Sequence, residues 1–288
     1  MQLLGIDFTS APRRAKPIVC ARGELKGDRL ACNELLAWDS FAPFDAFLAA
    51  PGPWIAAVDF PLGQPRRLVQ ALGWPEDWEA YIAEVAKLDK QAFCALLTDY
   101  CAGQPVGDKH HLRETDTLAK SCSPMMLYGV PVGKMFFEGA ARVLQSGATI
   151  MPCHAGDPNR TVIEGYPALV TRHLARHLPH NSARQSGKSP PKYKNDQADS
   201  DQRRQARERL LKQCQSSTAL AAYGVKLSLA TKLKRQIVDD ATGDSLDAVF
   251  CLIQAAAWHL NPAIIPTDAD PVEGWIADPT LGLTLGND

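Results

Sequence analysis

The sequence lacks any run of about 18 consecutive apolar residues, the length that a membrane-spanning helix requires. Its N-terminal stretch, MQLLGIDFTS, has neither a basic leader nor a small-residue cleavage site. The eight cysteines form no C-x-x-C pair, so their spacing indicates neither a zinc ribbon nor a disulfide framework. We therefore expect a cytoplasmic protein that does not use a membrane as its partner.

The composition also lacks the features of a disordered chain. Hydrophobic residues make up 45% of the 288 residues and charged residues 22%, which is the range of globular proteins with a sizeable core. The length lies at the upper end for one domain. We expect one elaborated α/β domain that spans residues 1–288.

Positive charge is concentrated in one segment, although the net charge of the chain is only −1. Residues 172–235 contain fifteen Lys and Arg against four acids, a local charge of +11. Such a segment favours a polyanionic partner such as nucleic acid. A solvated loop followed by a charged helix explains it equally well, because the segment lacks the interleaved aromatic residues of a stacking platform. Residues 179–200, rich in Ser, Pro, Lys and Asn, are expected to form a flexible basic loop.

Short apolar runs bounded by turn residues predict four strands near the N-terminus. They lie at residues 2–7, 17–22, 29–38 and 54–59. Lys26-Gly27-Asp28 predicts a tight turn, so the first three strands should form an antiparallel meander. The fourth should lie parallel beside the first.

The rest of the sequence is mainly helical in pattern. Residues 64–160 predict a helical insertion, with helices at 76–87, 90–102 and 136–145. Further strands are expected at residues 148–152 and 160–166, and further helices at residues 167–177, 202–215 and 244–259. The whole pattern predicts a mixed sheet flanked by helices.

Four aspartates occupy positions where chemistry is expected. Asp7 and Asp59 end two predicted parallel strands, and ligand sites form at the carboxyl ends of such strands. Asp244 and Asp247 are three residues apart and share one face near the start of the last helix. Carboxylates gathered in this way repel one another unless a hard cation binds to their oxygens. The sequence therefore predicts a Mg²⁺ or Mn²⁺ centre.

Three of these acids also have a structural explanation. Asp7 could cap the Thr-Ser turn that follows it, and Asp59 could orient the bend at Pro61. Asp244 could be the N-cap of the last helix. Asp247 has the weakest alternative, because it begins an otherwise apolar helix where an unpaired carboxylate would be costly to bury.

Other charged residues have two open interpretations. Glu164 follows a predicted strand and could be a fifth ligand or a general base, or it could pair with Arg160. Arg113, Lys192 and Lys194 could contact a substrate phosphate, or they could be solvated surface charges.

Six segments of the chain together resemble one known family over nearly its whole length. They are G-I-D-F-T-S-A, A-V-D-F-P-L-G, I-E-G-Y-P-A-L, P-K-Y-K-N, G-D-S-L-D-A-V-F-C and E-G-W-I. The chain resembles uncharacterised bacterial and archaeal proteins described as predicted RNase H-like nucleases. The resemblance implies an RNase H-like sheet with a two-metal centre of acids on the first strand, the fourth strand and the last helix. By position these are Asp7, Asp59, Asp244 and Asp247, with Glu164 as the other acid; the departure is the long helical insertion.

Three functional hypotheses follow from these observations. The first is a divalent-metal-dependent nuclease, motivated by the acids and the basic segment. The second is an ATP-binding phosphotransferase of the actin-like or sugar-kinase type, although both acidic strands lack the early glycine of a phosphate loop. The third is a non-catalytic nucleic-acid-binding protein in which the acids are structural.

Overall fold

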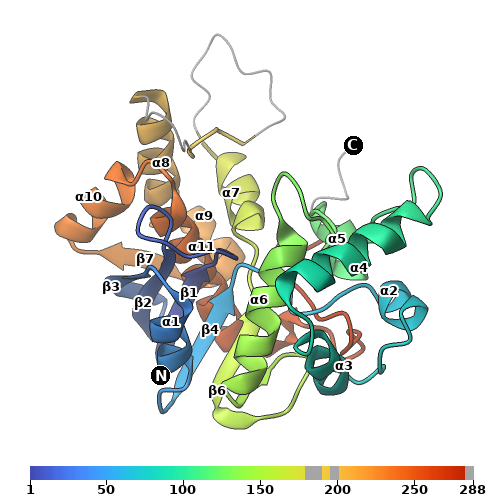
Figure 1. The fold of residues 1–288 in the computed structure, drawn as a ribbon. Helices are drawn as coiled ribbons and strands as arrows, with labels where there is room; N and C mark the ends of the chain where they lie inside the picture. Colours follow the sequence, from blue (N-terminus) through green and yellow to red (C-terminus); the bar gives the residue numbers. More distant parts are fainter. Residues whose placement is uncertain (179–189, 195–200, 283–288) are drawn as a thin grey trace.

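The computed structural model describes residues 1–178, 190–194 and 201–282 (Figure 1). Within these residues one mixed sheet has seven strands in the order β5-β6-β4-β1-β2-β3-β7. The strands are β1 (Gln2–Asp7), β2 (Ile18–Lys26), β3 (Arg29–Trp38), β4 (Trp54–Val58), β5 (Ala148–Ile150), β6 (Asp157–Glu164) and β7 (Lys226–Leu229). The expected α/β fold with a mixed sheet is confirmed.

Helices cover both faces of this sheet. Those before β5 are α1 (Phe41–Leu48), α2 (Arg66–Ala71), α3 (Trp78–Val85), α4 (Lys90–Ala102), α5 (Glu114–Ala119) and α6 (Val132–Gln145). Those after β6 are α7 (Pro167–Ala175), α8 (Asp201–Gln213), α9 (Ser217–Tyr223), α10 (Thr231–Asp239), α11 (Asp244–Leu260) and the 3-10 turn η1 (Pro262–Ile264). No helix among the described residues is both long and apolar enough to span a bilayer.

The N-terminal meander forms as the sequence predicts. β1 pairs antiparallel with β2, and β2 pairs antiparallel with β3. Gly27, with a φ of 60°, lies in the turn between β2 and β3. A positive φ is readily adopted by glycine, which has no Cβ to clash. β4 lies parallel beside β1, as expected, and β6 lies parallel beside β4. The carboxyl ends of β1, β4 and β6 therefore meet at one edge of the sheet.

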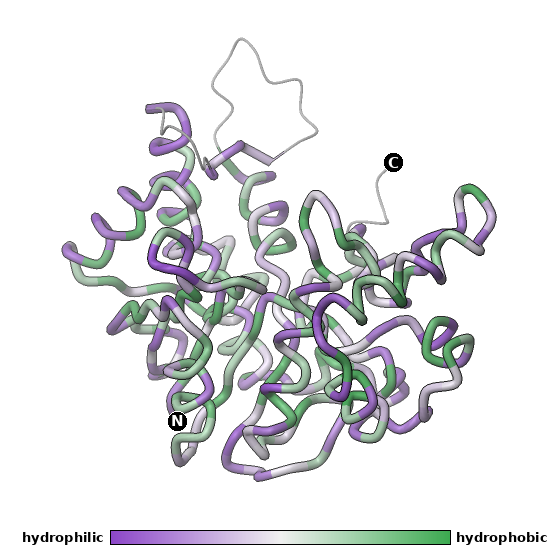
Figure 2. The backbone as a smooth tube through the Cα atoms, in the orientation of Figure 1, coloured by the Kyte–Doolittle hydropathy of each residue, from purple (hydrophilic) through white to green (hydrophobic). Residues whose placement is uncertain are grey.

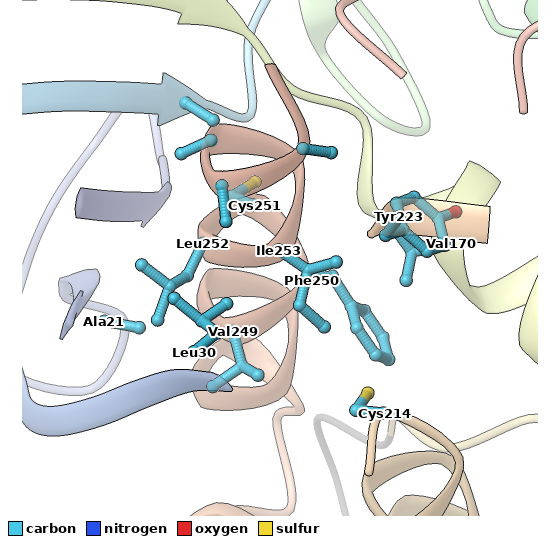
Figure 3. Close-up of a cluster of buried hydrophobic side chains, with 14 of the residues drawn as sticks. Ala21, Leu30, Val170, Cys214, Tyr223, Val249, Phe250, Cys251, Leu252 and Ile253 are labelled. Atoms are coloured by element: carbon cyan, nitrogen blue, oxygen red, sulfur yellow. The ribbon is translucent and has the colours of Figure 1, made fainter. Parts of the chain in front are cut away.

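Helix α11 is the central helix of the fold and packs directly on β1. A Cβ at Gly5 would lie 2.0 Å from the backbone nitrogen of Leu252, so only glycine lets the helix approach this closely. Figure 3 shows Leu252 and Val249 on the side of α11 toward the sheet, whereas Phe250 points away from it toward Cys214. Because α11 is buried between the sheet and other helices, its apolar sequence needs no polar face.

The opposite face of the sheet is covered by helices from the predicted insertion. Leu4 and Ile6 of β1 pack there in a second apolar cluster that includes Tyr81 of α3, Phe93 of α4 and Phe136 of α6. Leu3 belongs to the cluster around α11, so the side chains of β1 alternate between two cores, as a strand requires. Of the loop expected at residues 179–200, only residues 190–194 are among those described.

Candidate metal centre

Three of the four predicted aspartates meet at the carboxyl edge of the sheet. Asp7 ends β1, Asp59 follows β4, and Asp247 lies in the first turn of α11. The backbone N–H of Asp59 donates to the carbonyl of Ile6 at 2.9 Å. This bond holds Asp7 and Asp59 next to each other at the ends of two neighbouring strands. One carboxylate oxygen from each aspartate lies within 4.8 Å of the other two. The expected convergence is therefore present for these three residues.

Asp244 lies at the rim of this cluster and does not cap α11. The N-cap is Gly243, with a φ of 80°, and Asp244 is the first helical residue. The capping acceptor is Asp240, which accepts from the backbone N–H of Ser245 at 2.8 Å and from the hydroxyl of Thr242 at 2.7 Å. The N-cap interpretation of Asp244 is therefore wrong, because a residue five positions before Ser245 already satisfies that backbone donor.

The electrostatics of the centre show that its negative charge is incompletely balanced. Burial raises the pKa of Asp7 well above its usual range; repulsion from Asp244 adds to this, and Lys194 opposes it. Burial and then repulsion from Asp247 raise the pKa of Asp59 to about 7, again against the attraction of Lys194. Among the described residues, none donates a hydrogen bond to the carboxylate of Asp7 or Asp59.

Asp247 differs from the other acids because it has two protein partners. The ammonium of Lys194 forms an ion pair with its Oδ2, and the hydroxyl of Tyr193 donates to its Oδ1 at 2.6 Å. Burial lowers the pKa of Lys194, but the attraction of Asp247 outweighs it, so that this pKa lies well above the usual value. Lys192 is exposed and is not seen at the centre. Tyr193 was not predicted, although it stands between the two lysines that were.

Glu164 lies at the same edge, but its carboxylate is bound elsewhere. Arg113 donates to both of its oxygens at 2.6 and 2.7 Å, and the backbone N–H of Leu62 donates at 2.9 Å. The pairing with Arg160 that the sequence left open is wrong, because the Nε of Arg160 donates to Asp157 instead. Glu164 thus fixes the loop that follows Asp59.

Arg113 is a buried structural cation. Its side chain is 2% exposed, and besides Glu164 it donates to both oxygens of Asp116 at 2.8 and 2.9 Å and to the carbonyl of Glu273 at 3.0 Å. The interpretation as a solvated surface charge is wrong. Because its donors are directed to protein oxygens in a buried cluster, this geometry gives no support to contact with a substrate phosphate.

A cavity of about 340 Å³ opens beside the acidic cluster. Apolar side chains of the meander, including Val19 and Leu35, line one side, and Gln236, Thr242 and Asp244 line the other. Asp7, Asp59 and Asp247 do not line this cavity, so a molecule in it would meet the predicted acids at Asp244.

The donor set fits a hard divalent cation. Asp7, Asp59 and Asp247 offer only carboxylate oxygens, the ligands that Mg²⁺ and Mn²⁺ prefer. The incompletely balanced charge of Asp7 and Asp59 is the condition that such an ion relieves. No histidine or cysteine belongs to this group of ligands, which disfavours a zinc centre.

Comparison with known proteins yields one match. A family model described as "Protein of unknown function (DUF429)" matches residues 5–271, which include every member of the acidic cluster. No curated protein and no solved structure matches the chain significantly.

Proposed function

The chain belongs to the DUF429 family of proteins of unknown function, and we propose that it is a divalent-metal-dependent nuclease. The observation that carries this proposal is the approach of the Asp7, Asp59 and Asp247 carboxylates to within 4.8 Å from three separate elements. The order of the elements supports an RNase H-like assignment, because Asp7 ends the first strand, Asp59 follows the fourth, and Asp244 begins the last long helix. Membership of an uncharacterised family agrees with the resemblance read from the sequence.

The roles of the acids follow from their surroundings. Asp7 and Asp59, which receive no hydrogen bond from the described residues, would hold the cation together with Asp247. A bound Mg²⁺ or Mn²⁺ supplies Lewis acidity for phosphodiester hydrolysis and lowers the pKa of a bound water. Asp244 would face substrate in the adjoining cavity. Glu164 acts as a positioning residue, because it accepts from Leu62 in the loop after Asp59.

Two basic helices support nucleic acid as the substrate class. α8 carries Arg203, Arg204, Arg209 and Lys212 on its surface, and α10 adds Lys232 and Arg235. Both helices are predominantly hydrophilic (Figure 2). Ion pairs within the described residues, such as Arg204 with Asp239 and Lys234 with Glu208, partly neutralise this surface. Its affinity for nucleic acid should therefore be modest and should fall as salt is added.

A cleavage assay with Mn²⁺ tests the proposal. Single-stranded and duplex RNA and DNA are incubated with wild type, with Asp7→Asn and with the exposed control Asp28→Asn. We expect metal-dependent cleavage by wild type and the control, and a loss of at least about 100-fold in Asp7→Asn, because that change removes a metal ligand. Equal cleavage by wild type and Asp7→Asn would remove this centre from the mechanism.

The same samples distinguish the other hypotheses. Nucleic-acid binding without cleavage in all three proteins would favour a non-catalytic binding protein. A thermal shift with ATP and Mg²⁺ that Asp7→Asn abolishes would favour the phosphotransferase.

A further inference from the structure

The strap formed by residues 190–194 is held firmly against the acidic centre. Arg207, which is fully buried, donates to the backbone carbonyl of Tyr193 at 2.8 Å and to the carbonyl of Val238 at the same distance. The ring of Tyr193 meets Phe250 of α11 edge to face, with centroids 6.3 Å apart. These contacts fix the backbone next to Lys194 on two sides.

Gly243 allows the strap to approach the start of α11. A Cβ at this position would lie 2.9 Å from the Cγ of Lys194 and 3.2 Å from the ring of Tyr193. Its φ of 80° also favours glycine. The N-cap of the helix that carries Asp247 is therefore shaped to receive the side chain of Lys194.

Both oxygens of Asp247 are engaged by this strap. Lys194 contacts Oδ2 with its ammonium, and Tyr193 donates its hydroxyl to Oδ1 at 2.6 Å. The Asp247 side chain is 2% exposed, whereas 44% of the Lys194 side chain is exposed, so the lysine reaches the buried acid from outside. Asp7 and Asp59, by contrast, have no donor among the described residues.

The charge of the centre distinguishes one bound ion from two. The three clustered aspartates and Asp244 at their rim carry −4 when ionised, and Lys194 reduces this to −3. One divalent ion would bring the total to −1, and a second would make it +1. A second ion would also have to bind near an ammonium, because paired metals in such centres lie about 3.5–4 Å apart.

We propose that the ammonium of Lys194 is a permanent cation of this centre. It occupies the position beside Asp247 where a second divalent ion would bind, and so limits the centre to one ion. This inference rests on the proposed metal centre. It makes Lys194 the residue that determines how many ions the centre takes, and it makes Arg207, Tyr193 and Gly243 the residues that position it.

Calorimetric titration of the full chain with Mn²⁺ tests the stoichiometry. Lys194→Gln removes the charge and keeps a similar length, and Lys192→Gln makes the same change two residues away at an exposed position. We expect one bound ion in wild type and in Lys192→Gln, and two in Lys194→Gln. One ion in all three proteins, or two in wild type, would overturn the inference and leave the metal centre intact. No saturable binding in wild type would refute the centre itself, and the inference with it.

Electron paramagnetic resonance of bound Mn²⁺ gives a second measurement, which needs only wild type. A one-ion centre predicts the spectrum of isolated Mn²⁺ at every metal-to-protein ratio. A spin-coupled spectrum in wild type would overturn the inference, even if Lys194→Gln fails to fold.

Discussion

Two clusters of buried acids lie side by side at the carboxyl edge of the sheet. They differ in how far protein donors balance the charge of their carboxylates. The first is the Arg113 cluster, formed by Arg113, Glu164 and Asp116. Its guanidinium donates two hydrogen bonds to Glu164 and two to Asp116. In the acidic centre, Lys194 contacts Asp247, while Asp7 and Asp59 receive no donor from the described residues.

The difference shows that position at a strand end does not assign a role to an acid. Glu164 and Val58 are partners in the pairing of β6 with β4, so Glu164 and Asp59 leave the sheet at adjacent positions. One carboxylate has all the donors it needs and holds the loop at Leu62. The other receives no donor from the described part of the chain, which makes it available to a ligand.

The largest expected effect is on stability, when the balanced cluster is broken. Arg113→Met leaves two buried carboxylates without their cation, which should cost about 3–5 kcal/mol of unfolding free energy in urea denaturation. The control Arg67→Met removes an exposed ion pair with Asp108 and should cost far less, because solvent screens such a pair. Equal losses in the two variants would erase the contrast between the clusters.

The acidic centre should make metal-free stability depend on pH in a defined direction. The pKa of Asp59 rises from 3.8 to about 7, so the folded state holds this proton more tightly than the unfolded state. The resulting stabilisation is full below pH 3.8 and is lost as the pH rises through about 7. As the pH rises from 3.8 to about 7, chelator-treated wild type should therefore lose stability relative to Asp59→Asn. Parallel pH profiles would show that the fold does not raise the pKa of Asp59, which would contradict the account of the acidic centre.

Metal should stabilise the folded protein through one cluster only. At roughly 100 times its dissociation constant, Mn²⁺ should raise the unfolding free energy of wild type by about 2.7 kcal/mol. The gain should vanish in Asp247→Asn and persist in Glu164→Gln, because only Asp247 belongs to the acidic centre. Loss of the gain in Glu164→Gln would show that Glu164 contributes to metal binding, which would favour the ligand role that the sequence left open beside the other two.

The smallest effect is expected when a centre acid is neutralised without metal. Asp7→Asn should change the unfolding free energy by less than about 1 kcal/mol, because it removes a repelled charge that no donor of the described chain stabilises. Asp116→Asn should cost about 3 kcal/mol, because Asp116 accepts from Arg113 and Ser121. Urea denaturation in chelator measures both, and comparable losses would contradict the comparison.

Local patterns predicted much of the fold. The bounds of β1, β3 and α4 follow directly from apolar periodicity and turn residues. Several elements were not predicted individually, among them β7 and α10. β7 has four residues at an edge of the sheet, and α10 is mostly polar, so neither produces a long apolar pattern.

Residues of the candidate site could be predicted only where an acid lies at the end of a predicted strand or at the start of a predicted helix. Asp7, Asp59 and Asp247 stand at strand ends or at a helix start, which the sequence shows locally. The contact of Arg113 with Glu164 spans 51 residues, and that of Tyr193 with Asp247 spans 54. Such contacts depend on the packing of distant elements and leave no periodicity in the sequence.

The central claim is that the unbalanced acids form a metal centre, and a Mn²⁺-soaked crystal measured at the manganese edge tests it most directly. We predict an anomalous difference peak between the carboxylates of Asp7, Asp59 and Asp247, and none at Glu164. Absence of a peak at the three aspartates at saturating Mn²⁺, with their oxygens hydrogen-bonded to protein instead, would contradict the account.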